Sequence, residues 1–198
     1  RLRSLQITVW MGPKIHVVQY PVRRGQGLNV VAIVQRTVEG GIEGWDHSAN
    51  AQDLRAALSG ACRPLQDLAA AIEHWRLWPL CDRPPMRSAS EQARGRVALL
   101  GDAAHPMRPY MAQGAGMAIE DAACLQHVLT PPDVPMAQRL QTYAGLRWQR
   151  NARVQERSIR NGKIFHAQGP VRWGRDLAMR LRGERLMDVP WLYGGAPF

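Results

Sequence analysis

The middle of the chain combines residue types that can hold a polar ligand. A short apolar run, 97–100, ends at Gly101, and Asp102 follows. Glycine lets the backbone approach a ligand closely, and the carboxyl ends of strands are where open α/β sheets bind ligands. A short carboxylate there suits the hydroxyl groups of a sugar or polyol. Gly114 and Gly116 then open a predicted helix, whose N–H groups favour negative charge.

Other nucleotide and catalytic motifs are missing from the sequence. The third glycine of a dinucleotide fingerprint would fall at Ile119 after Gly114 and Gly116, and at Val30 after Gly25-Gln26-Gly27. Neither pair has the strand–helix–strand unit that the motif needs. The sequence also has no phosphate-binding loop, His-Glu-x-x-His zinc helix or Gly-x-Ser-x-Gly elbow. These observations exclude the corresponding enzyme classes.

The net charge of the chain bears on which partners it could bind. The net charge is +10, which makes nucleic acid an obvious candidate partner, but no nucleic-acid-binding motif is present. Much of the excess lies on one face of a predicted helix, at Arg147, Arg150, Arg153, Arg157, Arg160 and Lys163. We interpret this face as solvated, with docking to a protein or steering of anionic ligands as alternatives.

The three cysteines, Cys62, Cys81 and Cys124, are odd in number and lack metal-site spacing. We therefore expect reduced core thiols in a cytoplasmic protein, and no metal site. No charged-then-apolar leader follows Arg1, and the apolar runs are too short to cross a bilayer.

The elements that position these residues fall into three predicted segments: 1–82, 83–130 and 131–198. The first begins with an antiparallel meander of three strands. Helices follow, with Ser48 or Asn50 as N-cap of the first and Pro64 opening the second. The expected strands are 5–11, 14–20 and 28–34, the helices are 52–58 and 65–73, and residues 74–80 are extended.

The second segment has a polar loop over 83–96, a fully buried strand over 97–100, and a helix over 116–129. The third has a long helix over 136–166, ended by Gly169-Pro170, and a last helix over 171–186. The predicted class is α+β. It combines an antiparallel sheet covered by helices, one strand and helix of a split α/β domain, and a long C-terminal helical segment.

At Gly101-Asp102-Ala103-Ala104-His105-Pro106 and Gln113-Gly114-Ala115-Gly116-Met117, the sequence resembles single-component flavin-dependent aromatic hydroxylases. The likeness is closest to salicylate and 3-hydroxybenzoate hydroxylases, and both segments are similar to that family's second FAD motif. Weaker resemblance covers nearly the whole chain. The sequence departs from the family in two places. The family's N-terminal Rossmann-type unit with its glycine loop is absent, and the segment 87–94 is longer and more polar than the family's lead-in to the strand over 97–100.

The resemblance implies cofactor contacts for a set of motif residues. Gly101 and Asp102 would hold the ribityl or pyrophosphate side of FAD. Ala115, Gly116 and Met117, after Gly114, would place N–H groups near the flavin N1–O2 edge and stabilise negative charge on the reduced flavin. Pro106 would shape the loop beside the isoalloxazine. An ordinary turn aspartate and simple helix-start glycines are the alternatives.

The resemblance also implies a substrate side. Pro109 would lie in the reaction pocket, and Gln113 could contact the phenol of the substrate. His16, on a strand expected to line the pocket, could accept or relay the phenolic proton. The alternatives are a stiffening proline, an exposed loop glutamine and a structural histidine. His105 is expected to pack, as are the methionines of the motif.

The implied parent enzyme is an FAD-dependent monooxygenase that hydroxylates a phenolic aromatic acid with NADH or NADPH and O2. Its N-terminal FAD-binding half would be the partner of this chain, as a second polypeptide or as another segment, and the 198 residues alone are expected to be inactive. A non-catalytic assembly module and a basic nucleic-acid-binding domain are the alternatives. The sequence leaves open which aromatic acid is the substrate.

Overall fold

The computed structural model describes residues 6–36, 47–48, 51–183 and 188–194. Contacts divide the chain into two compact units. The first unit comprises Arg1–Pro79 and Lys163–Gly183, and the second comprises Leu80–Gly162 and Glu184–Phe198. These units cut across the predicted segments, because residues of the predicted segment 131–198 contribute to both.

The first unit is built on a three-stranded antiparallel sheet, as predicted. Strands β1 (Thr8–Gly12), β2 (Ile15–Val22) and β3 (Gly27–Val34) are neighbours in sequence order. In this register Trp10 pairs with Val17, which in turn pairs with Ala32. Successive side chains of a strand point to opposite faces, so Ile15 and Val17 share one face and His16 lies on the other.

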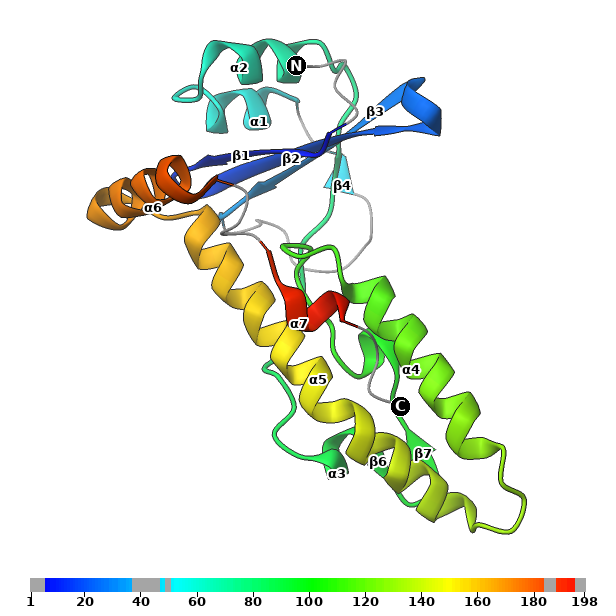
Figure 1. The fold of residues 1–198 in the computed structure, drawn as a ribbon. Coiled ribbons are helices and arrows are strands. Elements are labelled where there is room, and N and C mark those ends of the chain that lie inside the picture. Colours follow the sequence, from blue (N-terminus) through cyan, green and yellow to red (C-terminus); the bar gives the residue numbers. More distant parts are fainter. Residues whose placement is uncertain (1–5, 37–46, 49–50, 184–187, 195–198) are drawn as a thin grey trace. The chain divides into compact units, whose positions relative to one another are not determined.

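Two helices cover the face that carries Ile15 and Val17 (Figure 1). They are α1 (Ala51–Ala57) and α2 (Arg63–Ala70), and Leu58, Leu65 and Leu68 join the two strand residues in one core cluster. Pro64 lies in the first turn of α2, as predicted.

The predicted N-cap at Ser48 is wrong, because Ser48 lies in strand β4 (His47–Ser48), which pairs with β5 (Arg76–Leu77). Asn50 lies outside the described residues. The last element of the first unit is helix α6 (Gly169–Arg182). The long helix α5 (Met136–Phe165) ends before Gly169, as expected, and its final residues belong to this unit.

The second unit contains two helices side by side, α4 (Gly114–Leu129) and the main part of α5 (Figure 1). Met117 of α4 packs with Val154 of α5, and Leu129 packs with Leu140. The helices therefore run in opposite directions. Helix α7 (Pro190–Tyr193), which the sequence did not predict, also belongs to this unit.

The predicted loop over 83–96 is wrong in its second half, which forms helix α3 (Ala89–Gln92) and strand β6 (Ala93–Arg94). Strand β6 pairs with β7 (Val97–Ala98) across a turn at Gly95. The predicted burial of 97–100 is also wrong, since Val97 is 65% exposed and Leu100 is 40% exposed. Among the described residues, β7 has β6 as its single strand neighbour.

The cysteine prediction holds for one thiol. Cys124 is buried, whereas Cys62 and Cys81 are exposed, and all three are free. The residue type alone does not tell whether a short side chain in a polar turn is buried. Across the ranges that the structure describes, no helix combines the length and the apolar character needed to cross a bilayer.

Candidate functional site

The Gly-Asp pair forms a tight turn at the start of the candidate site. It opens the 3-10 helix η2 (Gly101–Ala103), with Gly101 at a φ of +57° that favours glycine. A Cβ on Gly101 would lie in contact with α4, 3.4 Å from the Cβ of Ala118. Asp102 is exposed, and a Cβ on Gly114 would lie 3.9 Å from its Oδ1 atom.

The beginning of α4 presents backbone donors next to this carboxylate. The N–H of Met117 donates to the carbonyl of Gln113 at 2.9 Å. The N–H groups of Gly114, Ala115 and Gly116 therefore precede the first α-helical bond. The first turn carries no acidic side chain, so its positive helix end is available to a negatively charged or electron-rich group.

The side chain of Gln113 lies close to Gly116. A Cβ at Gly116 would lie 2.9 Å from Oε1 of Gln113, so the glutamine side chain would have to move aside to admit one. The Gln113 amide is thus folded back over the start of the helix. The turn at Gly101 and Asp102 and the helix start at Gly114 are brought together in one place.

The loop between the turn and the helix is anchored to α5. Nε2 of Gln155 donates to the carbonyl of Pro106 at 2.8 Å, and Oγ of Ser158 donates to the carbonyl of Arg108 at 2.7 Å. Tyr110 is buried, and Pro109 beside it is exposed. The long helix therefore fixes the loop while one side of Pro109 remains accessible.

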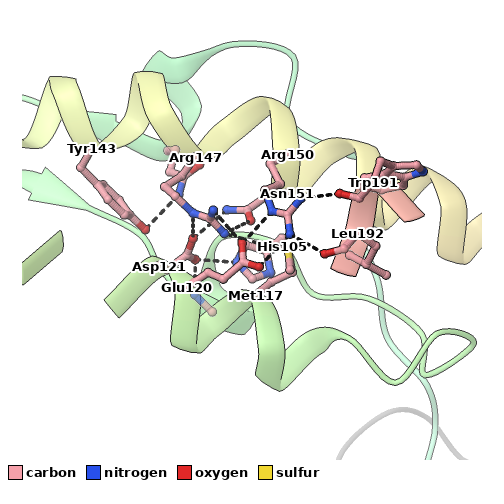
Figure 2. A network of polar contacts seen from close by, with 12 residues as sticks. His105, Met117, Glu120, Asp121, Tyr143, Arg147, Arg150, Asn151, Trp191 and Leu192 are labelled. Atoms are coloured by element: carbon pink, nitrogen blue, oxygen red, sulfur yellow. Dashed lines mark hydrogen bonds and ion pairs between the residues drawn. The ribbon is translucent and has the colours of Figure 1, made fainter. Parts of the chain in front are cut away.

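A fully buried carboxylate, Asp121, holds the turn, the loop and α5 together (Figure 2). Its Oδ2 atom accepts from the N–H of Gly101 at 3.1 Å and from Nε2 of His105 at 2.6 Å. Its Oδ1 atom accepts from Nε of Arg147 at 2.9 Å and from Nδ2 of Asn151 at 3.0 Å. His105 is therefore a packed residue of the motif, as expected.

Glu120 forms the second half of this network. It forms an ion pair with Arg147 Nη1 at 2.8 Å, and it accepts hydrogen bonds from Arg150 Nε at 2.7 Å and Nη2 at 2.8 Å. Figure 2 shows both arginines reaching from α5 to the adjacent acidic residues of α4. Two acidic residues on α4 thus face two arginines one turn apart on α5.

The charges of the two carboxylates are stabilised by their partners. Burial alone would raise the pKa of Asp121, but hydrogen bonds from His105, Asn151 and Arg147 outweigh burial and lower it. Burial likewise opposes the charged form of Glu120, and the bonds from Arg150 and Arg147 lower its pKa below the usual value. Both carboxylates are therefore ionised at neutral pH.

The predicted solvated face of α5 is wrong at these positions. Arg147 is 0% exposed, and the Arg150 side chain is 11% exposed. Sequence reasoning missed Asp121, Glu120 and Asn151 as well. A signal was present, because adjacent acidic residues on α4 complement arginines spaced by three on α5, but it requires knowing that the two helices pair.

His16 belongs to the first unit, whereas the other predicted site residues belong to the second. Its Nδ1 atom lies 2.7 Å from Nε2 of His166, and its ring meets that of Phe165 edge-on. Burial, with the neighbouring His166 as a second cause, lowers the pKa of His16 to about 4. It is therefore neutral at pH 7, and its burial and pairing favour a structural role.

Comparison with known proteins shows which proteins this chain is similar to. A family model described as "FAD binding domain" matches residues 13–158. The 3-hydroxybenzoate 6-hydroxylase of Polaromonas naphthalenivorans is 36% identical over 94% of this chain and 46% of its own length. The 3-amino-4-hydroxybenzoate 2-monooxygenase PtnB3 of Streptomyces platensis is 39% identical over 98% of this chain and 49% of its own.

A solved structure of a salicylate hydroxylase substrate complex is similar in fold. Its TM-score is 0.80 at 27% identity, over 96% of this chain and 47% of that one. The chain therefore spans about half the length of the curated relatives it matches.

Proposed function

Because the chain belongs to the FAD binding domain family, we propose that it is the C-terminal half of an FAD-dependent monooxygenase. This enzyme hydroxylates a phenolic aromatic acid, with NADH or NADPH and O2 as co-substrates. The observation that carries the proposal is the juxtaposition of the Gly101-Asp102 turn with the glycine start of α4. The remaining half of the protein is the partner that completes the site.

The residues present fit two parts of FAD, the ribityl or pyrophosphate side and the N1–O2 edge of the flavin. The exposed carboxylate of Asp102 suits the hydroxyl groups of the ribityl chain or the neighbouring pyrophosphate side, and Gly101 allows the backbone to approach. The N–H groups of Gly114, Ala115 and Gly116, which precede the first helical bond, suit the electron-rich N1–O2 edge of the flavin. Met117 follows them, with its own N–H bonded to the Gln113 carbonyl. When bound, FAD supplies the electron-transfer and oxygen chemistry that amino-acid side chains lack.

The substrate side is assigned to the loop that precedes α4. Pro109 is exposed beside the anchored Tyr110, and Gln113 carries an amide that can donate to or accept from a phenolic hydroxyl. The role in taking or relaying the phenolic proton that the resemblance implies for His16 stays a prediction, and its burial and its contact with His166 favour a structural role. With its lowered pKa of about 4, neutral His16 accepts a proton only weakly.

The FAD assignment is tested with Asp102→Ala in the full-length protein. We expect the dissociation constant of FAD, measured by flavin fluorescence, to rise at least about tenfold, since a charge-assisted hydrogen bond contributes roughly 1.5–3 kcal/mol. Asp133→Ala removes another exposed aspartate of the same unit and serves as the control. An unchanged FAD dissociation constant in Asp102→Ala sinks the assignment.

The substrate assignment is tested by the coupling of NAD(P)H consumption to hydroxylated product. Loss of a group that orients or deprotonates the phenol leaves reduced cofactor to react without hydroxylation, so we expect uncoupling in Gln113→Ala. The same measurement on His16→Gln separates a chemical role from a structural one. If coupling stays complete in both variants, neither residue handles the phenol.

A further inference from the structure

We propose that Arg150 is a positioning residue for the FAD site, because it locks the C-terminal helix α7 onto the beginning of α4. This inference rests on the function proposed above. Arg150 lies on α5 and reaches α4 and α7 at the same time (Figure 2). Its guanidinium group therefore joins three elements that are distant in sequence.

The contact with α4 is a two-pronged ion pair. Arg150 donates to both oxygens of Glu120, at 2.7 and 2.8 Å. Both side chains are largely shielded from water, with 11% of Arg150 and 21% of Glu120 exposed. A planar guanidinium can match a carboxylate in this way, whereas a lysine ammonium cannot.

The contact with α7 uses two further N–H donors of the same guanidinium group. Nη1 donates to the carbonyl of Trp191 at 3.2 Å, and Nη2 donates to the carbonyl of Leu192 at 2.9 Å. Helix α7 has four residues, so the carbonyls of Trp191 and Leu192 belong to its last turn, where no further helical N–H is available to them. Arg150 thus caps α7 and uses four of its N–H donors in doing so.

The apolar side of α7 lies against the residue that follows the glycine start of α4. Val189 and Leu192 pack with Met117, which is 1% exposed, and with Val154 of α5. If α7 moved away, the Met117 side chain would lose its cover. The first turn of α4 would then lose the support that fixes its N–H groups.

The same contacts have an electrostatic consequence. Glu120 lies in the second turn of α4, near the N–H groups that we assign to the flavin edge. Arg150 neutralises its charge, together with Arg147. Without Arg150, a less compensated carboxylate near the helix start disfavours negative charge on the flavin. The midpoint potential of bound FAD should then become more negative.

The test uses the full-length protein with Arg150→Gln and Arg150→Lys. In Arg150→Gln we expect the FAD dissociation constant to rise about tenfold, as for the loss of one charge-assisted hydrogen bond, and the midpoint potential to fall. Arg150→Lys keeps the charge but loses the fork, so the potential stays closer to wild type while binding is still weakened. A merely structural role would lower the melting temperature and leave both flavin readouts unchanged.

Arg153→Gln is the matched control. Arg153 lies on the same helix and contacts the same segment, with its guanidinium carbon 3.9 Å from the ring centre of Trp191. An exposed contact of this kind is weak, so the FAD dissociation constant should change less than about threefold.

Leu192→Ala provides a second variant that leaves the ion pairs in place and uncovers Met117. It should weaken FAD binding by about threefold or more through the cavity it creates. If Leu192→Ala and both folded Arg150 variants keep the wild-type dissociation constant and potential, the inference is overturned. A wild-type protein that binds no FAD instead contradicts the proposed function.

Discussion

At the scale of single residues, Asp121 and Glu120 differ from His16 in how their shielding from water is accommodated. Asp121 and Glu120 are charged and fully partnered, so their burial is offset by arginine and hydrogen-bond donors. His16 is neutral, and its burial is accommodated by the loss of charge. The carboxylates and His16 lose their contributions to stability in different pH ranges, which gives a test of the lowered pKa of His16.

We predict that the free energy of unfolding decreases as the pH falls from about 6.5 to about 4. The folded pKa of His16 is lowered to about 4 from the ordinary value of 6.5. In this window the unfolded chain binds a proton at His16 that the folded chain does not bind. Lowering the pH therefore favours the unfolded chain. Up to about 3 kcal/mol is involved, at roughly 1.4 kcal/mol for each pKa unit.

Chemical denaturation of wild type and His16→Gln at several pH values checks this prediction. The variant should show a flatter dependence of stability on pH in this window. Asp121 and Glu120 have lowered pKa values, so their contributions are lost only at lower pH. Equal slopes for the two proteins between pH 6.5 and 4.5 would contradict the assignment to His16.

The sequence indicated the local chemistry of the site but not the groups that hold it. Gly101 adopts a conformation that favours glycine, and Gly114 begins a helix beside it, so the motif carries its own geometry. The assigned roles of these residues stay predictions. Arg147 was expected in solvent because the spacing of charges defines a helix face but not what covers that face.

At the scale of elements, close packing of α5 on the motif loop depends on Gly162. A Cβ on Gly162 would lie 2.5 Å from Cε2 of Tyr110, which is 8% exposed. The ring has to shift to admit any side chain there. We predict that Gly162→Ala lowers the free energy of unfolding by about 1–3 kcal/mol through overpacking.

Gly145→Ala is the matched control on the same helix, since a Cβ there meets nothing within 4 Å. Its expected effect has the opposite sign, a gain of about 0.5–1 kcal/mol, because alanine favours a helix over glycine. The two variants are compared by chemical denaturation. A stabilising Gly162→Ala would show that the Tyr110 ring does not constrain α5.

Elements with a local signal were predicted well. The meander followed from β-rich runs over 5–11, 14–20 and 28–34, and α4 and α5 followed from long helical patterns. Ser48 was misassigned because its strand pairs with Arg76, a contact distant in sequence. The exposed Val97 was misassigned because apolar character alone does not say which strands lie beside it.

At the scale of the whole molecule, several large apolar side chains lie on the surface. In the second unit Val97 is 65% exposed and Ile119 is 70% exposed. In the first unit, Trp173, Leu177 and Leu181 of α6 are each more than half exposed. The α6 residues are spaced by four and so share one helix face, and an apolar face of this kind marks an interaction surface or an aggregation liability.

We predict that a polypeptide limited to these 198 residues self-associates, or stays soluble only when packed against the rest of the protein. It should bind FAD poorly and show no hydroxylase activity, because the second half of the proposed site is not part of it. Size-exclusion chromatography with light scattering measures the outcome. A stable, FAD-free monomer with the mass of one 22.2 kDa chain would be incompatible with this account.

The division into two units has a practical outcome for cloning. The chain passes from one unit to the other three times, after Pro79, after Gly162 and after Gly183. Shortening the gene from either end therefore yields neither unit by itself, because residues of the other unit always remain. Producing the first unit by itself requires joining Pro79 to Lys163 through a synthetic linker, and a single protease nick after Pro79 leaves the two fragments held together by their non-covalent contacts.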